Sequence, residues 1–196
     1  MSLRAALTRA VEATGAPSSD YDLNKDAVIP ERALREAGVL IPVVDAAEPR
    51  LILTKRSSAL KHHPGQIAFP GGKVEDTDRD VVAAALREAE EEIALRDVEV
   101  IGRLSSHVTV TGFNVVPVLG LVSGKYSVRA DDREVAEVFE VPLAHVMDSS
   151  NYLIESRQWR GKARHYFTVP WGPYYIWGAT ARMLRAMADR MADEAN

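Results

Sequence analysis

Three glutamates near the middle of the chain are spaced so that their carboxylates would share one face of a helix. At about 100° per residue, with Glu88 at zero, Glu91 falls at roughly −60° and Glu92 at roughly +40°. Like charges on one helix face raise the free energy, and a bound divalent cation would reverse that cost. Mg²⁺ prefers oxygen ligands, so the spacing indicates a site for metal-bound phosphates. The competing interpretation is an ordinary solvated face, which we expect for Glu90.

The neighbouring residues predict the elements that must position these glutamates. The run Phe69-Pro70-Gly71-Gly72 predicts a tight turn that feeds a helix. We expect the helix over residues 77–95, with Thr77 or Asp78 as its N-cap. Its buried stripe, beside the acidic one, is formed by Val81, Ala85, Ala89 and Ile93.

The segment resembles the Nudix box, G-x5-E-x7-R-E-U-x-E-E-x-G-U, in which U is a bulky apolar residue. The matching positions are Gly72, Arg87, Glu88, Glu91, Glu92 and Leu95. Asp78 stands where the first Glu is expected, and eight residues instead of seven separate it from Arg87. Ala89 is small for a U position, and Ala94 replaces the final Gly. Because Ala adopts left-handed backbone less easily than Gly, we expect the helix to run slightly past Ala94.

The resemblance implies an α/β fold, the Nudix α/β/α sandwich with a mixed β-sheet between helices. It also implies Mg²⁺ or Mn²⁺ held by Glu88, Glu91, Glu92 and the carbonyl of Gly72. One of the three glutamates would act as the general base, and which one is left open. Arg87, four residues before Glu91, is placed to pair with it and hold it.

A second motif lies just upstream of the box, and we refer to residues 52–72 as the signature segment. It resembles L-L-T-x-R-S-x3-R-x3-G-x3-F-P-G-G, which marks the coenzyme A pyrophosphatase branch of the Nudix hydrolases. The spacing matches throughout, with Ile52 for a Leu and Lys61 for an Arg. The resemblance implies hydrolysis of coenzyme A or its acyl derivatives to 4′-phosphopantetheine and adenosine 3′,5′-bisphosphate.

The signature segment also carries the densest basic cluster of the chain, at Lys55, Arg56, Lys61, His62 and His63. Coenzyme A has a diphosphate and a separate 3′-phosphate, so its pocket needs positive charge away from the metal. Ser57 and Gln66 are further candidates for substrate contact, and for His63 we favour a phosphate or loop-stabilising role. The competing interpretation is a strand end and loop with ordinary surface bases.

Several residues outside the two motifs are weaker candidates. Glu134, directly before an apolar strand, is the candidate for a further site carboxylate. Stacking on adenine competes with a core or interface role for Trp159, Trp171, Trp177, Tyr174 and Tyr175. His107, His145 and His165 are scattered, and no pattern pairs them with a nucleophile as in a serine hydrolase.

Composition limits the remaining possibilities. The 196 residues predict a single Nudix domain over 31–196, preceded by a helix and an irregular polar lead-in over 1–30. The formal charge of −4 disfavours a nucleic-acid polymer as partner, and the absence of cysteine excludes thiol chemistry. No apolar run is long enough to span a membrane, and we expect a cytoplasmic protein. The aromatic C-terminal region leaves a homodimer open.

Hydrophobic periodicity and turn residues predict the other elements. We expect helices over 3–14 and 179–192, and a hairpin of 152–159 and 163–169 around Arg160-Gly161-Lys162. The other expected strands are 38–45, 50–55, 98–108, 114–122 and 135–141.

Two alternatives to coenzyme A hydrolysis remain. One is a Nudix hydrolase of another nucleoside diphosphate derivative. The other is a non-catalytic Nudix-like module that binds a nucleotide, which we would expect to have lost carboxylates that are all present here.

Overall fold

A computed structural model describes residues 2–13, 15–24, 26–27, 31–159 and 161–193. The helices are α1 (Leu3–Glu12), α2 (Val81–Ile93), α3 (Leu143–Met147) and α4 (Gly178–Asp193), with a short 3₁₀ turn at Ser149–Asn151. The strands are β1 (Ser18–Ser19), β2 (Arg35–Val44), β3 (Arg50–Arg56), β4 (Ile67–Ala68), β5 (Gly71–Lys73), β6 (Glu99–Arg103), β7 (His107–Val108), β8 (Phe113–Val122), β9 (Val135–Pro142), β10 (Leu153–Trp159) and β11 (Lys162–Thr168). None of the described helices is long and apolar enough to cross a membrane.

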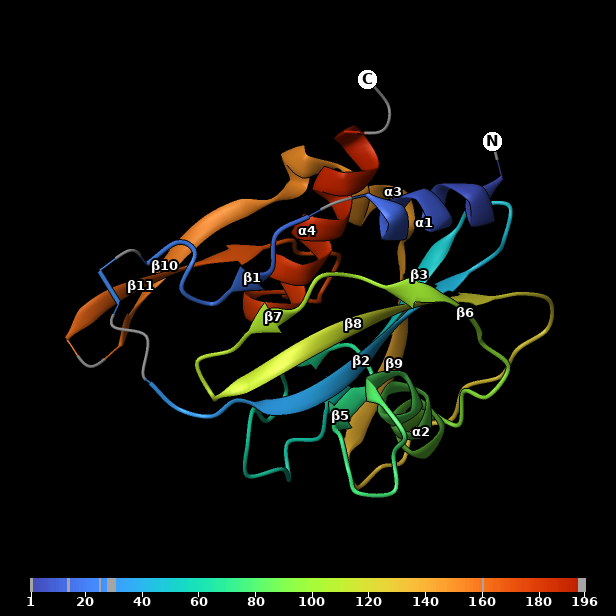
Figure 1. Ribbon diagram of the computed structural model, residues 1–196, viewed down its shortest axis with the longest axis horizontal. Helices are drawn as coiled ribbons and strands as arrows, with labels where there is room; N and C mark the ends of the chain where they lie inside the picture. The colour runs from blue at the N-terminus through green and yellow to red at the C-terminus, as the bar shows by residue number, and fades with distance from the viewer. Residues whose placement is uncertain (1, 14, 25, 28–30, 160, 194–196) are drawn as a thin grey trace.

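A mixed sheet forms the centre of the molecule, as predicted. β2 and β8 run parallel over ten paired positions, from Arg35↔Phe113 to Val44↔Val122. The main path of the sheet is β1-β7-β8-β2-β3-β4, and β5, β6 and β9 pair with β2, β8 and β3. β10 and β11 form a separate hairpin that extends beside α4 (Figure 1).

Alternating residues of the central strands build two cores on the two faces of the sheet. On one face, Ile41 and Leu53 pack with residues of α1, α3 and α4. On the other face, Leu40 and Ile52 pack with the stripe of α2 formed by Ala85, Ala89 and Ile93. Figure 1 shows α2 on one side of the sheet and α1 and α4 on the other. The three layers are the α/β/α sandwich that the sequence predicts.

The acidic helix begins at Val81 instead of residue 77, about one turn later than expected, because its N-cap is Asp80. The Asp80 carboxylate accepts hydrogen bonds from the backbone of Val82 and Ala83. The predicted caps, Thr77 or Asp78, are wrong. The carboxylate of Asp78 is instead engaged by Arg87 and by the backbone N–H of Glu75.

The prediction that the helix continues past Ala94 is also wrong. Ala94 has φ 56° and ψ 24°, which is left-handed backbone, and its N–H donates to the carbonyl of Glu90. The N–H of Leu95 donates to Ala89, and the Leu95 side chain is buried. The contact of Leu95 with the core outweighs the modest cost of a left-handed alanine, so the helix ends at Ile93 as it would with glycine.

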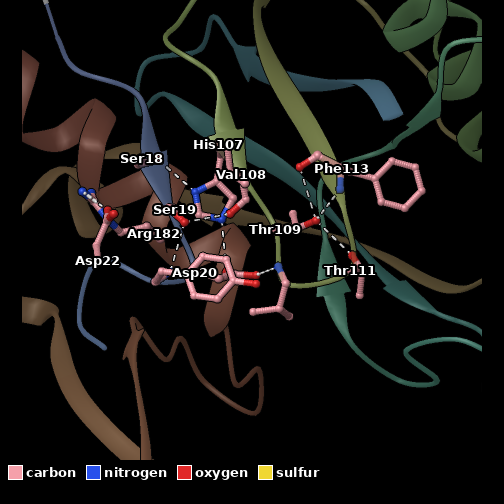
Figure 2. A network of polar contacts seen from close by, with 12 residues as sticks. Ser18, Ser19, Asp20, Asp22, His107, Val108, Thr109, Thr111, Phe113 and Arg182 are labelled. Carbon is pink, nitrogen blue, oxygen red and sulfur yellow. Dashed lines mark hydrogen bonds and ion pairs between the residues drawn. The ribbon is translucent and has the colours of Figure 1, made fainter. Parts of the chain in front are cut away.

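The polar lead-in, expected to be irregular, contains β1 and is attached to the sheet through His107. The ring Nδ1 of His107 lies 2.9 Å from Ser18 Oγ, and Nε2 lies 3.1 Å from Asp20 Oδ1. Asp20 Oδ2 also accepts the N–H of Val110 at 2.9 Å. Figure 2 shows His107 between Ser18 and Asp20. His107 and Ser18 are buried, so the three side chains anchor the lead-in. No sequence pattern indicated these contacts of His107 with Ser18 and Asp20.

The remaining elements follow the sequence with local differences. The hairpin is confirmed in full register from Leu153↔Thr168 to Trp159↔Lys162, and Arg160 of its predicted turn lies outside the described residues. The strand expected over 98–108 is split into β6 and β7, separated by residues 104–106. The apolar pattern did not predict β4, β5 or α3, which are too short for a periodic signal.

Replacing Ala94 with Gly should raise the free energy of unfolding by about 0.5–1 kcal/mol, because glycine adopts left-handed backbone without strain. Ala83→Gly, inside the same helix, should lower it by about 0.5–1 kcal/mol. Urea denaturation of both variants measures the difference. Equal destabilisation by the two changes would contradict a strained Ala94.

Candidate functional site

The turn before α2 brings its backbone into direct contact with the acidic helix. β5 pairs with β2, and this pairing fixes Gly71 and Gly72 beside the helix. A Cβ atom built on Gly72 would lie 2.4 Å from Oε1 of Glu88, and one on Gly71 would lie 2.5 Å from the carbonyl of Gly38. At Gly71 the close atoms belong to the backbone of Gly38 and Val39, so only glycine permits this approach, whereas at Gly72 a side chain would displace the Glu88 carboxylate.

Glu92 is the most deeply placed carboxylate of the site. Its side chain is 4% exposed, Oε2 accepts the N–H of Gly71 at 3.2 Å, and Oε1 lies 3.8 Å from Arg56 Nη1. Burial raises the pKa of Glu92 to about 7, and the neighbouring Glu88 and Glu134 carboxylates act in the same direction. The hydrogen bond from Gly71 and the charge of Arg56 oppose the shift.

Arg87 connects the carboxylates of the helix to the preceding loop. It donates from Nε to Asp78 Oδ1 at 3.0 Å and from Nη2 to Asp78 Oδ2 at 2.9 Å. Its Nη1 lies 3.0 Å from Glu88 Oε1 and 3.1 Å from Glu91 Oε2. The predicted pair with Glu91 is therefore confirmed. Asp78, which replaces the first Glu of the box, orients Arg87.

Glu88 and Glu91 differ in their exposure. The side chain of Glu88 is 15% exposed, and burial raises its pKa, whereas Glu91 is 59% exposed. Glu134 lies close enough for its charge to raise the pKa of Glu88 as well as Glu92. The backbone carbonyl of Glu134 accepts the N–H of Ser57, and this hydrogen bond holds Glu134 beside the signature segment.

The oxygen atoms gathered here suit a hard divalent cation. Two half-buried or buried carboxylates, an exposed third and a backbone turn without side chains form a donor set of oxygens only. Among the described residues, no three His, Asp or Glu side chains already converge in a metal-ligand cluster. Arg87 occupies one oxygen each of Glu88 and Glu91.

The signature segment runs along β3 and returns through β4. Lys55, Lys61 and His63 are exposed. Ser57 is buried, and its Oγ accepts the N–H of Ala59. Gln66 is half-buried, and its backbone carbonyl accepts the N–H of Arg56 at 2.9 Å.

The aromatic residues near the C-terminus pack against different partners. Tyr174 stacks on Phe139 with centroids 3.6 Å apart, and Trp171 lies 4.8 Å from His145. Trp177 packs edge-on against Tyr166 at 5.1 Å. The side chain of Trp159 lies outside the described part. Packing within the protein therefore accounts for the contacts of Trp171 and Tyr174.

Sequence reasoning did not foresee the ion pair of Arg56 with Glu92. The two residues belong to different motifs, and nothing in their spacing places them side by side. The N-cap Asp80 was likewise missed, although an Asp directly before the periodic residues is a recognised helix-start signal.

The layered fold and the acidic helix behind a glycine turn define a Nudix hydrolase, and comparisons with known proteins agree. A NUDIX domain model matches residues 34–162. The chain is 45% identical over 156 residues to the uncharacterized Nudix hydrolase NudL of Enterobacter sp. (strain 638), covering 79% of this chain and 81% of that one. The NudL protein of Cronobacter sakazakii is 43% identical over 162 residues, with 82% and 84% covered.

The chain therefore belongs to the Nudix family, and its close homologues are bacterial proteins named NudL. As a Nudix hydrolase it cleaves phosphoanhydride bonds of nucleoside diphosphate derivatives, and such enzymes generally use divalent metal ions.

Solved structures share the fold at low sequence identity. A MutT/nudix family protein from Enterococcus faecalis superposes with a TM-score of 0.54 and 18% identity, covering 86% of this chain and 66% of that chain. The MutT protein from Methanosarcina mazei Go1 gives a TM-score of 0.51 and 17% identity, covering 86% and 99%.

The raised pKa of Glu92 predicts how stability depends on pH when metal is chelated. The Glu92 carboxyl group stays protonated up to about pH 7 in the folded protein, whereas in the unfolded chain it ionises near pH 4.5. The free energy of unfolding therefore falls as the pH rises from about 4.5 to about 7. The side chain of the Glu92→Gln variant cannot ionise. Its free energy of unfolding, relative to that of the parent, should therefore rise by on the order of 2–3 kcal/mol from pH 4 to pH 8. Urea denaturation at both pH values with a chelator measures this gain. A constant difference between the two proteins would contradict the shift.

Proposed function

We propose that this Nudix hydrolase is a metal-dependent coenzyme A diphosphatase, which cleaves coenzyme A or its acyl derivatives to 4′-phosphopantetheine and adenosine 3′,5′-bisphosphate. The observation that carries the proposal is the contact of Arg56 with Glu92 at 3.8 Å. It brings the signature segment, with its phosphate-binding residue types, to the acidic helix. The cytoplasm remains the proposed location.

In this proposal the carboxylates of Glu88, Glu91 and Glu92, with the carbonyl of Gly72, hold Mg²⁺ or Mn²⁺. A divalent ion bound there supplies charge neutralisation for the diphosphate and lowers the pKa of a bound water. Arg87 orients Glu88 and Glu91 from its anchor on Asp78. One of the three carboxylates accepts the proton of the attacking water. Glu134 is a further carboxylate beside Glu88 and Glu92.

Substrate selection is assigned to the signature segment. Arg56 offers a planar fork of donors suited to phosphate, and the exposed Lys55 and Lys61 add mobile point charges. Ser57 and Gln66 tie the strand and the loop together through backbone contacts, and His63 lies within the same loop. Arg56, Lys55 and Lys61 supply the positive charge that would pair with the diphosphate and with the separate 3′-phosphate.

Replacing Glu91 with Gln should lower kcat for coenzyme A with Mg²⁺ or Mn²⁺ by about 100-fold or more, the scale on which a positioned base contributes. The exposed side chain carries little of the fold, so thermal unfolding should stay close to the parent. Glu90→Gln is the matched control, because Glu90 lies on the same helix but pairs with Arg96. Near-normal turnover by Glu91→Gln would exclude the proposed role of the acidic helix.

A substrate panel tests the assignment of coenzyme A. We expect kcat/KM for coenzyme A to exceed that for dephospho-coenzyme A by about tenfold or more, since a charge-assisted hydrogen bond contributes roughly 1.5–3 kcal/mol. The panel includes acyl-coenzyme A, NADH and nucleoside diphosphate derivatives, each with Mg²⁺ and with Mn²⁺. Faster cleavage of dephospho-coenzyme A or of an unrelated nucleotide would show that the signature segment has another substrate.

A further inference from the structure

The two edges of the β10–β11 hairpin differ in how they are covered. On the β11 side, the N–H of His165 donates to Oδ1 of Asn24 at 2.8 Å, and the Asn24 amide donates to the carbonyl of His165 at 2.9 Å. Directly after β11, the N–H of Val169 donates to the carbonyl of Ile176 at 2.9 Å. The lead-in and the segment before α4 therefore cover this edge of the hairpin.

The register of the hairpin determines which backbone groups of β10 point outward. In an antiparallel pair, opposite residues alternate between pairs that exchange hydrogen bonds and pairs whose N–H and C=O groups point away from each other. His165 directs both groups to Asn24, and its partner in register is Ser156. Ser156 therefore points its N–H and C=O away from β11, and by the same alternation Ile154 and Gln158 do so too. Within the described part of the chain, no hydrogen bond reaches these outward groups.

The β10 edge has few of the features that protect natural edge strands. All residues from 153 to 158 are exposed, and Leu153 and Ile154, at 55% and 57%, are the most exposed large hydrophobic residues of the described chain. The strand is 7 residues long, contains no proline and pairs with β11 without a bulge. Figure 1 shows the hairpin projecting away from the central sheet. Because a free row of N–H and C=O groups can pair with another strand, an edge of this length indicates a partner strand.

The sequence of β10 is complementary to itself in the antiparallel direction. When two copies pair about Ser156, Ser156 faces its own counterpart, and Ile154 faces Gln158 of the second copy. These are the residues with outward groups, so each opposed pair would exchange two hydrogen bonds. The charged residues of β10, Glu155 and Arg157, then lie opposite each other. Sliding one copy by two residues would instead place Glu155 opposite Glu155 or Arg157 opposite Arg157, which is destabilising.

This pairing leaves the contacts within each chain in place. Glu155 accepts the hydroxyl of Tyr175 at 2.6 Å, and the guanidinium carbon of Arg157 lies 4.7 Å from the centroid of the Trp177 ring. Both contacts lie over a face of the hairpin, whereas a second strand approaches along its edge. The backbone groups carry the pairing, and the opposite charges act only on the choice of register.

We infer that the protein forms a dimer in which β10 pairs antiparallel with β10 of a second copy, about a two-fold axis at Ser156. The two hairpins then join into one continuous sheet, and both copies contribute the same surface to the contact. A contact made by one strand edge is small, so the dimer dissociates on dilution. The inference does not depend on the proposed function, because it uses no residue of the acidic helix or of the signature segment.

Ser156→Pro tests the backbone hydrogen bonds. Proline removes the N–H of residue 156, which points away from β11, so the hairpin keeps its own ladder. The donor is lost from both copies at once, and the dissociation constant of the dimer should rise about tenfold or more. Ser156→Ala keeps the N–H and should dimerise like the parent. Ala163→Pro is the matched control, because Ala163 is exposed, faces Gln158 and directs its N–H outward from the other edge.

Sedimentation equilibrium over about 1–500 µM protein measures these dissociation constants, since small interfaces require high concentrations. Circular dichroism and thermal unfolding verify that each variant is folded.

Introduced cysteines test the register, because the chain has none of its own. Residues opposed in a hydrogen-bonded antiparallel pair have Cα atoms about 5.5 Å apart, which a disulfide can span. Ser156→Cys should therefore form a disulfide-linked dimer on mild oxidation. Ile154→Cys should not, because it faces Gln158 of the second copy, and Ala163→Cys on the covered edge should not either.

A parent that stays monomeric up to about 500 µM would overturn the dimer and leave the β10 edge to an extended segment of another protein. A dimer that Ser156→Pro does not weaken, or equal crosslinking of the three cysteine variants, would place the contact elsewhere. Where Ser156→Pro does not fold, the crosslinking pattern alone decides between these outcomes.

Discussion

The burial of the Glu92 carboxylate is the constraint on which the rest of the site depends. Glu92 is 4% exposed, and a charge in such a place is costly unless hydrogen bonds and opposite charge offset the lost hydration. The N–H of Gly71 and the guanidinium of Arg56 provide that offset in part, which leaves the pKa of Glu92 at about 7. Both partners belong to the signature segment, so helix and segment have to be positioned together.

The two-sided core of the sheet achieves this positioning. β2 carries alternate residues to both cores and also pairs with β5, the strand that contains the glycine turn. The start of α2 approaches β2 so closely that a Cβ atom on Gly38 would lie 2.1 Å from the carbonyl of Val81. Close contact of helix and sheet sets the distance of Glu88 and Glu92 from the turn. Arg87, anchored on Asp78, then fixes the carboxylates that remain nearer to solvent.

Local signals explain which elements were predicted. Long periodic segments such as β8 and α4 were found because burial on one face imposes a regular spacing. Errors occurred where tertiary contacts outweighed local preference. Ala94 is left-handed because the buried Leu95 requires it, and Asp78 is no cap because Arg87 engages it. The pairing of His107 with Ser18 and Asp20 joins positions 87 and more residues apart, which no local pattern can reveal.

The sequence by itself determined the family, the acidic face of α2 and the residue types of the signature segment, because these depend on short-range spacing. The tertiary structure decided how the three glutamates differ, with Glu92 buried, Glu88 half-buried and Glu91 exposed. It also decided that Arg56 meets Glu92 and that Arg157 lies over Trp177. Burial and charge contacts between distant segments arise only when the sheet brings these segments together, and they set the hydration and pKa of each group.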